Sequence, residues 1–265
     1  ITWGGDATDN GDGTGTIPDT TDADGNGEWS LTLSYEVAGD EVVPDFSGGG
    51  VSGSIDAGIT WHAINSLSSF VVEASPTDLT AGQASTITIT ARDSYQNPIP
   101  NYAPTNDIVV TYGGSAPASD VTFSGSNVTD NGDKTATIPS TVVFDSEGKF
   151  TLQVTSTYAE ANVNINVTEG GTSADTVTDV TWNPGGLDHY TATASDYGPT
   201  AGGSVTITLV ARDVYGNAIP NANPSGAITC TASGADDGTR ITWGGDATDN
   251  GDGTGTIPDT TDADG

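Results

Sequence analysis

Apolar and polar residues alternate along several short runs of this 265-residue chain. Every second residue is apolar in residues 86–91 and again in residues 205–209. The same spacing recurs in residues 150–154 and in residues 162–167, where asparagines take the alternate positions. A strand with one buried face requires this period of two. No segment carries an apolar stripe with the 3.6-residue period of a helix, so the pattern predicts an all-β chain.

Turn-forming clusters separate these runs at short intervals. Examples are Gln96-Asn97-Pro98, Asn131-Gly132-Asp133 and Gly48-Gly49-Gly50. Glycine, proline, asparagine and aspartate favour tight turns between strands. About seven short strands in roughly 100 to 120 residues are typical of an immunoglobulin-like β-sandwich.

The chain repeats itself at its two ends. Residues 1–25 recur without a change as residues 241–265, which defines a repeat of 240 residues. Identity over such a length does not follow from composition, so the chain covers one period and the start of the next.

A second, more diverged repeat lies inside the first. Thr80-Ala81-Gly82 returns as Thr200-Ala201-Gly202, and Ala91-Arg92-Asp93 returns as Ala211-Arg212-Asp213, both at a spacing of 120 residues. The 240-residue repeat therefore contains two modules, named A and B below.

The module boundaries do not coincide with the chain ends. Module A occupies residues 68–186 and is complete, whereas module B is divided into an N-terminal part, residues 187–265, and a C-terminal part, residues 1–67. An uncovered apolar sheet face is unstable in water. We therefore expect the apolar face of residues 29–35 to be covered by residues 187–240 of a preceding copy. That copy is either the same polypeptide continued or a neighbouring subunit that exchanges strands.

The order of these motifs resembles a known family. Thr-Ala-Gly, an alternating strand, Ala-Arg-Asp-x-Tyr-x-Asn, Ile-Pro-Asn, Asp-Asn-Gly and an aromatic-x-Leu strand follow one another as in the bacterial Ig-like repeats of invasin/intimin-type and related giant surface proteins. The resemblance implies tandem Ig-like sandwiches in an extracellular stalk, adhesin, surface layer or filament. It implies no catalytic residues.

The charge of the chain is strongly one-sided. Five Lys and Arg residues stand against 36 Asp and Glu residues, for a net charge of −31. Nucleic acid and anionic membranes repel such a chain. Salt or bound cations of a saline or calcium-containing exterior would neutralise it, although a merely soluble surface is the alternative. No run approaches the ~18 apolar residues of a membrane span, and no secretory signal is present, as expected of an internal segment.

One loop has the spacing of a calcium site. Asp22, Asp24 and Asn26 form a D-x-D-x-N-G pattern, and Asp9 and Asp12 could add oxygens from a nearby hairpin. Calcium takes six to eight oxygen ligands. The bidentate Glu of a complete calcium loop is absent, so an ordinary turn without an ion is the alternative.

Other polar residues admit both structural and chemical interpretations. Asp93 and Asp213 open the turn after the second strand of each module, where they either accept backbone hydrogen bonds or bind an ion at the module junction. Asn127 and Asn166 begin N-glycosylation sequons.

No pattern of residues predicts an enzyme. His62 and His189, the only histidines, lie near module boundaries without a nucleophile or metal-binding motif. Cys230, the only cysteine, lies in a strand-like run, which indicates a buried thiol.

Two apolar features point to contacts between parts. Val42, Val43 and Phe46 lie in a Gly- and Asp-rich segment that we interpret as an insertion, which either folds onto its own domain or docks on a neighbouring subunit. Trp61 and Trp182 occupy matched positions before the junctions and are expected to pack one module on the next, with a sugar-binding platform as the alternative.

The sequence therefore predicts a structural protein of tandem Ig-like sandwiches that forms or contributes to an extracellular filament, stalk or surface layer, stiffened by cations. The expected partners are copies of itself, with no nucleic acid and no membrane insertion. The alternative is a ligand-binding adhesin, for a carbohydrate or a host receptor, with these modules as spacers or binding units.

Overall fold

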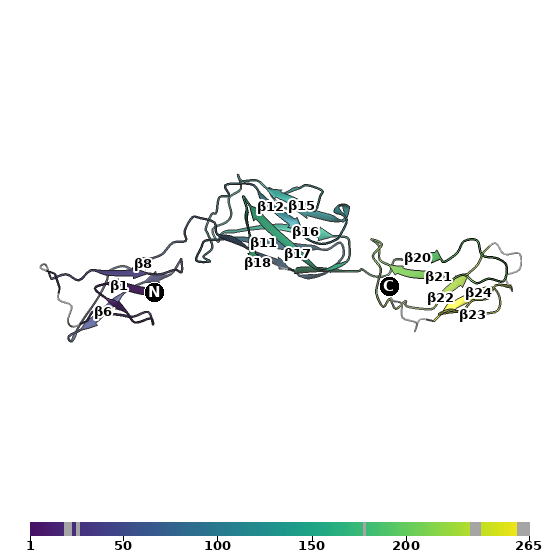
Figure 1. Ribbon diagram of the computed structural model, residues 1–265, viewed down its shortest axis with the longest axis horizontal. Helices are drawn as coiled ribbons and strands as arrows, with labels where there is room; N and C mark the ends of the chain where they lie inside the picture. Colours follow the sequence, from purple (N-terminus) through teal and green to yellow (C-terminus); the bar gives the residue numbers. More distant parts are fainter. Residues whose placement is uncertain (19–22, 25–26, 177–178, 234–239, 259–265) are drawn as a thin grey trace.

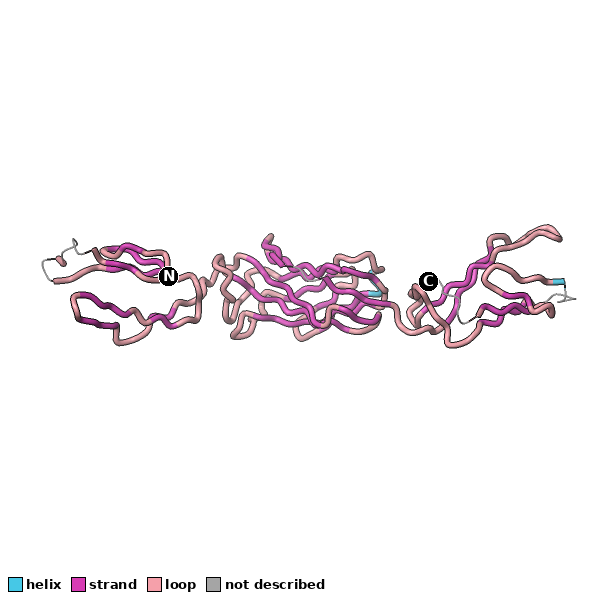
Figure 2. Tube along the Cα trace, turned by 90° about the horizontal axis from the view of Figure 1, so that it is seen from below, coloured by secondary structure: helices cyan, strands magenta, loops and turns pink. Residues whose placement is uncertain are grey.

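The computed structural model describes residues 1–18, 23–24, 27–176, 179–233 and 240–258. Its strands fall into three groups that share no sheet, and the groups lie in a row along the long axis (Figures 1 and 2). They are named the first unit (residues 1–67), the central unit (residues 68–186) and the third unit (residues 187–265). Apart from a 3₁₀ position at Arg240, the only helix within the described residues is the single 3₁₀ turn η1, Ala118–Asp120, so this part of the chain is all-β. That part of the chain offers no helix of sufficient length and apolarity to cross a membrane.

The central unit carries eleven strands joined in one continuous set of pairings. They are β9 Ser69–Ser75, β10 Asp78–Thr80, β11 Ala84–Arg92, β12 Ile108–Tyr112, β13 Val121–Ser124, β14 Thr129–Asp130, β15 Thr135–Ile138, β16 Lys149–Ser156, β17 Glu160–Glu169, β18 Thr172–Thr176 and β19 Asp179–Asn183.

These strands form two layers that join along one edge. One layer has the order β13-β16-β11-β9, and the other has the order β17-β12-β15-β14. Strand β18 pairs with β9 in the first layer and with β17 in the second, and β19 pairs with β17 and β10. The sandwich is therefore closed on one side and barrel-like there.

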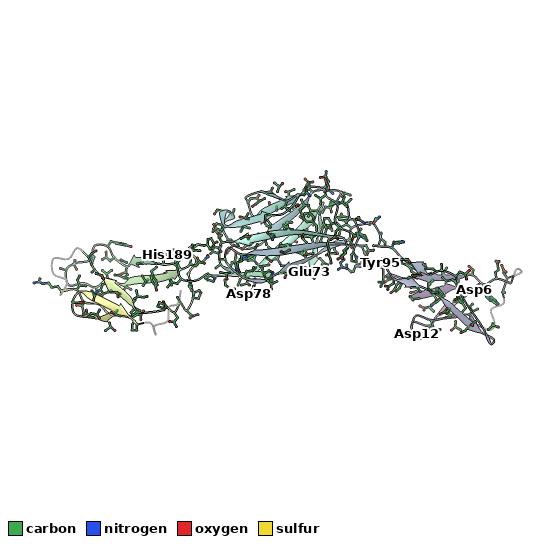
Figure 3. All side chains as sticks on the ribbon, turned by 180° about the vertical axis from the view of Figure 1, so that it is seen from behind. Asp6, Asp12, Glu73, Asp78, Tyr95 and His189 are labelled. Carbon is green, nitrogen blue, oxygen red and sulfur yellow. The ribbon has the colours of Figure 1, made fainter. Side chains whose placement is uncertain are left out.

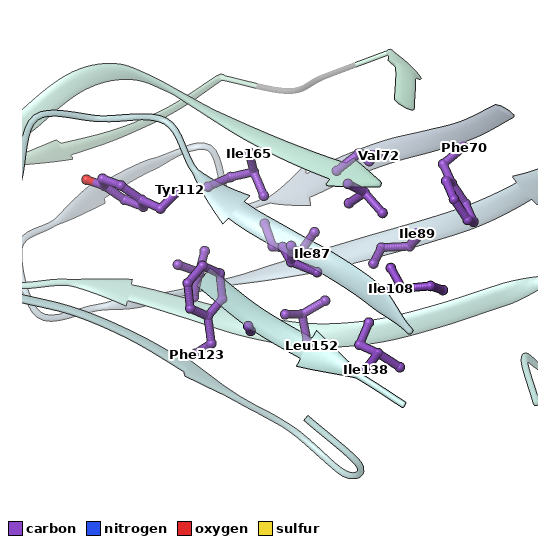
Figure 4. Packing of buried hydrophobic residues seen from close by; sticks show 14 of the residues in the cluster. Phe70, Val72, Ile87, Ile89, Ile108, Tyr112, Phe123, Ile138, Leu152 and Ile165 are labelled. Carbon is purple, nitrogen blue, oxygen red and sulfur yellow. The ribbon is translucent and has the colours of Figure 1, made fainter. Parts of the chain in front are cut away.

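The alternating residues of the sequence build the core between the layers. Ile87 and Ile89 of β11 are 0% exposed, and they face aliphatic residues of the other layer such as Ile108 (Figure 4). Thr88, which lies between them, is half-buried and takes the opposite face of the strand. Burying one such side chain contributes roughly 1.5–3 kcal/mol, so this face stabilises the central unit.

The first and third units contain shorter strand pairs. The first unit has β1 Thr2–Gly5, β2 Thr8–Asp9, β3 Gly15–Thr16, β4 Leu31–Ser34, β5 Glu41–Val42, β6 Asp45–Gly48, β7 Val51–Ser54 and β8 Ile59–Thr60. The third unit has β20 His189–Ala194, β21 Ile207–Arg212, β22 Ile228–Thr231, β23 Thr248–Asp249 and β24 Thr254–Ile257.

The register of these pairs repeats the register of the central unit. In the first unit, Trp3 of β1 lies opposite Leu33 of β4, as Phe123 lies opposite Val154 in the pair β13·β16. The pairs β2·β3 and β23·β24 both repeat β14·β15.

The third unit follows the same rule. Tyr190 lies opposite Ala211 in β20·β21, as Phe70 lies opposite Ala91 in β9·β11. The pair β22·β24 corresponds to β12·β15. Each end unit thus reproduces a different subset of the central unit's strand pairs.

The segment interpreted as an insertion is part of this framework. Val42 of β5 lies opposite Ile59, as Val163 of β17 lies opposite Val180. The hairpin β6·β7, which contains Phe46, corresponds to β17·β18. The interpretation of this segment as an insertion is therefore wrong. A local excess of Gly and Asp concealed a strand with the normal alternation.

The prediction that Trp182 packs one module on the next is also corrected. Trp182 is 1% exposed inside the central unit, where its ring lies against Tyr112 and its indole N–H donates to the carbonyl of Gln83 at 2.9 Å. Trp61 packs edge-to-face on Tyr35 of its own unit, with ring centroids 5.7 Å apart. Trp182 therefore belongs to the core of its own module, whereas Trp61 also lines a cavity between the first and central units, together with Arg92 and Pro98.

Candidate functional site: the module junctions

An aspartate and an asparagine four residues later form the centre of each junction. Asp93 and Asn97 lie in the turn after β11, and Asp213 and Asn217 lie in the turn after β21. Both aspartates are 0% exposed. In the first turn, the backbone N–H groups of Tyr95 and Asn97 both donate to Asp93 Oδ1, at 2.9 Å. These bonds hold both carboxylate and amide at the end of the unit, aimed at the preceding one.

Three hydrogen bonds connect the first turn to the preceding unit. The backbone N–H of Ile64, in the linker, donates to Asp93 Oδ2 at 3.0 Å. The N–H of Ala38 donates to Asn97 Oδ1 at 2.9 Å, and Asn97 Nδ2 donates to the carbonyl of Glu36 at 2.8 Å. The Asn97 amide therefore uses its donor and its acceptor on one loop of the first unit.

The second junction contains the same three bonds. Gly185 N–H donates to Asp213 Oδ2 at 2.9 Å. Ala159 N–H donates to Asn217 Oδ1, and Asn217 Nδ2 donates to the Thr157 carbonyl, both at 2.8 Å. Because donor, acceptor and sequence spacing agree at both junctions, the contact is a repeated connector between modules.

The electrostatics of the buried aspartates match this connecting role. Burial is the largest influence on the pKa of Asp93 and by itself raises that pKa, but the hydrogen bonds from Ile64, Asn97 and Tyr95 together outweigh it, so the pKa is lowered. The pKa of Asp213 is lowered by the same balance. Both carboxylates are therefore ionised at neutral pH, and hydrogen bonds to an ionised acceptor are stronger than neutral ones.

A tyrosine from the same turn adds an apolar contact at the second junction. A side chain at Gly82 would overlap the ring and hydroxyl of Tyr215, so the ring lies directly on the glycine backbone. The matching Tyr95 lies at the end of the central unit next to the first unit (Figure 3) and is 50% exposed.

The sequence analysis identified Asp93 and Asp213 but missed the asparagines and tyrosines. Of the two roles considered for these aspartates, the geometry supports the structural one, because both carboxylates accept backbone hydrogen bonds. The signal for the others was present in the repeated Ala-Arg-Asp-x-Tyr-x-Asn motif, whose last two fixed residues are Tyr95 and Asn97 in the first copy.

The structure describes three of the five candidate calcium ligands, Asp9, Asp12 and Asp24. Asp22 and Asn26 lie outside the described residues. Asp24 Oδ1 accepts from the Glu28 N–H at 3.0 Å, and Asp9 and Asp12 accept backbone N–H groups of their own turn. Hydrogen bonds from Thr14 lower the pKa of Asp12. Within the described ranges, no three His, Cys, Asp or Glu residues gather closely enough to hold a metal ion. The calcium hypothesis stays a prediction.

The remaining candidate residues lie on strands and turns of the outer surface. Asn127 is exposed in a turn with φ 59°, and Asn166 is half-buried on β17 opposite Thr111. Glycosylation at both stays a prediction. His62 is exposed, and His189 Nδ1 lies 2.9 Å from Asp188 Oδ2.

The candidate docking residues of the first unit lie on β5, on β6 and in the short link between these strands. Val42 is half-buried, whereas Val43 is 49% and Phe46 38% exposed. Cys230 is half-buried in β22.

Comparisons with known proteins give structural neighbours only. Neither the protein-family models nor the curated proteins include a match to this sequence. Among solved structures, the chain is similar to the Escherichia coli adhesin FdeC, with 19% identity, 76% of this chain and 58% of that chain covered, and a TM-score of 0.38.

Two further neighbours are bacterial surface proteins. The Yersinia pseudotuberculosis adhesin InvE has 18% identity, with 71% of this chain and 48% of that chain covered and a TM-score of 0.35. Domains 1–6 of the surface layer protein SbsC have 17% identity, with 87% and 26% covered and a TM-score of 0.29. The chain spans less than two thirds of the length of each. Bacterial adhesins of the invasin type and S-layer proteins are thus among its neighbours, as the sequence resemblance predicted.

Proposed function

We propose that this chain is a repeating structural segment of an extracellular filament, stalk or surface layer, in which Ig-like modules, two in each 240-residue repeat, are held end to end by the Asp–Asn connector. The observation that carries the proposal is the recurrence of the same three inter-unit hydrogen bonds at both junctions. When every junction has the same geometry, each added module extends the array by the same step.

The chemistry of the surface supports the same role. Acidic residues such as Asp6, Asp12, Glu73 and Asp78 occur on separate units and do not converge on one cleft (Figure 3). A distributed charge of −31 keeps long arrays soluble and apart, and it favours an exterior in which salt or cations screen it. The rod itself performs the function, because reach grows with the number of copies.

The test is the length of tandem arrays of one to four repeats, measured by electron microscopy and small-angle X-ray scattering. A linear increase in length with copy number is expected. An increase with the square root of copy number, as for a flexible chain, would overturn the proposal. Arrays with both Asn97→Ala and Asn217→Ala serve as the matched flexible control.

The adhesin alternative predicts a different result. A two-module unit that retains a carbohydrate or a host-cell receptor at micromolar concentration, with the binding lost on substitution of exposed residues, would assign recognition to the modules themselves. Absence of binding from all modules, together with linear growth in length, leaves them as spacers.

A further inference from the structure

The first and third units each contain only one strand of each of the two strand pairs that join the halves of a complete sandwich. In the central unit, the ladders β11·β16 and β12·β17 join its N-terminal half to its C-terminal half. The third unit contains the counterparts of β11 and β12, namely β21 and β22. The first unit contains the counterparts of β16 and β17, namely β4 and the β5–β6 segment. Neither end unit has both members of a ladder.

The side chains that these ladders would bury are partly exposed. Ile87 of β11 is 0% exposed, whereas the corresponding Ile207 of β21 is 54% exposed. Val167 of β17 is 0% exposed, whereas the corresponding Phe46 of β6 is 38% exposed. The two end units therefore present complementary apolar faces, one from each half of the same sandwich.

We propose that residues 187–265 of one copy and residues 1–67 of a second copy assemble into one β-sandwich, joining copies head to tail. This rests on the proposed filament function and names the contact that would extend it. The occupant is a second copy because the central unit lies between the two end units of each chain, which holds its own halves apart (Figures 1 and 2).

The strand pairings of the central unit predict the register of the joined sandwich. Ile87 lies opposite Leu152, so Ile207 of one copy will lie opposite Leu31 of the next. On the other layer, Val109 lies opposite Thr168, so Thr229 of one copy will lie opposite Ser47 of the next. Slipping this register by one residue would turn the apolar set outward, so a single pairing is favoured.

The joint also completes the first junction. Tyr215 rests on Gly82 at the second junction, and the residues 120 positions earlier and later in the repeat are Tyr95 and Gly202. The ring of Tyr215 occupies the position of a Cβ on Gly82, whereas nothing lies within 4 Å of the position that a Cβ of Gly202 would occupy. Assembly brings Gly202 of one copy onto Tyr95 of the other.

Because each copy carries one half at each end, the contact is heterologous and does not close on itself, which yields open chains. The duplicated stretch slows this growth. Each joined sandwich has room for only one of the two identical stretches, residues 1–25 or residues 241–265. The other stretch must be displaced from its present partner, β4 or β22. Association is therefore expected to follow the slow kinetics of strand exchange.

The experiment uses the full chain with Cys230→Ser, which removes the only native thiol. The double substitution Ser47→Cys and Thr229→Cys places one thiol on each side of the joint, and both positions are exposed in the isolated chain. Ser52→Cys with Thr229→Cys is the matched control, because Ser52 lies opposite Ser47 in β6·β7, one strand further from the joint. Mild oxidation is followed by non-reducing electrophoresis and light scattering.

We expect a series of covalent multimers from the Ser47/Thr229 variant. Cross-linking should be at least tenfold more efficient in this variant than in the control. Mixing the two single-cysteine chains should give covalent dimers alone. Ile207→Lys should abolish both products while the central unit keeps its melting temperature. Monomers at every concentration, equal cross-linking in the control, or a disulfide within one chain would overturn the proposal. Tandem arrays complete module B within one polypeptide, so their length test succeeds or fails independently.

Discussion

Asn217 donates its side-chain amide to the backbone carbonyl of Thr157 at 2.8 Å, and so ties the third unit to the end of β16 in the central unit. The same amide group accepts from the Ala159 N–H through Oδ1. One side chain therefore fixes a three-residue loop of the neighbouring module, which a linker alone would leave free to rotate.

Removing this amide should loosen the junction without unfolding either unit. Asn217→Ala deletes the two inter-unit hydrogen bonds of this side chain and a third one to Asp213 Oδ2 in its own turn. Each is worth about 0.5–1.5 kcal/mol, so the substitution should broaden the distance distribution between spin labels on the central and third units. Val214→Ala, in the same turn and 67% exposed, is the control and should leave the distribution narrow. Equal widths in the two variants would contradict the connector.

The junctions should also loosen in acid. The pKa values of Asp93 and Asp213 are lowered below the ordinary 3.8. A carboxylate with a depressed folded-state pKa contributes stability above its unfolded pKa and loses it as the pH falls through the folded value. Junction order, measured by X-ray scattering, should therefore be constant from about pH 8 to 5 and decrease below about pH 4. In the double variant Asp93→Asn and Asp213→Asn, the curve should be flat and the rod already loose at pH 7.

Substitutions at matched core positions should destabilise the central unit more than the third unit. Ile87→Ala removes a side chain that is 0% exposed and should destabilise the central unit by about 2–5 kcal/mol in urea unfolding. Ile207→Ala, at 54% exposure, should cost under about 1 kcal/mol in the dilute monomer. A similar large cost for Ile207→Ala in dilute monomer would show that this face is already buried.

The two Thr-Ala-Gly turns offer a second matched pair. Gly82 and Gly202 both have positive φ, 87° and 84°, so alanine strains both turns by about 1 kcal/mol or more. Only at Gly82 does the added methyl overlap Tyr215. Gly82→Ala should therefore widen the second junction in the spin-label measurement, whereas Gly202→Ala should not. Equal effects would assign the change to backbone strain.

The Asp24 hairpin allows the turn and calcium interpretations to be separated. Asp24 Oδ1 accepts from Glu28 N–H at 3.0 Å, and Asp145 Oδ1 accepts from Lys149 N–H at 2.8 Å in the matching turn. Asp24→Ala and Asp145→Ala should each speed amide exchange at the lost donor, by an amount equivalent to about 1 kcal/mol.

Repeating the exchange measurement with calcium and with excess chelator tests the ion. A calcium site at Asp22, Asp24 and Asn26 makes exchange at Glu28 calcium-dependent in the parent chain, while Lys149 stays unaffected, because its turn has Asp145-Ser146-Glu147-Gly148 instead. Calcium-independent exchange at both amides would leave the turn as the only role of Asp24.

Much of the strand framework was readable from the pattern of residues. Alternation around Ile87 and Ile89 predicted a strand with one buried face, and those residues are the centre of the core. The repeat of Ala91-Arg92-Asp93 as Ala211-Arg212-Asp213 predicted matching modules, and the pairs β9·β11 and β20·β21 that contain these residues have the same register. Where local composition masked the period, as around Phe46, the prediction was wrong.

The sequence by itself determined the all-β class, the 240-residue period and the correspondence between the parts, because these depend on local alternation and on identity at fixed spacing. Only the tertiary structure decided which repeated residues reach across a junction. Asn97 bonds a loop about 60 residues away and Trp182 turns into its own core. Such contacts depend on where distant loops meet in space, and neither periodicity nor motif spacing encodes that position.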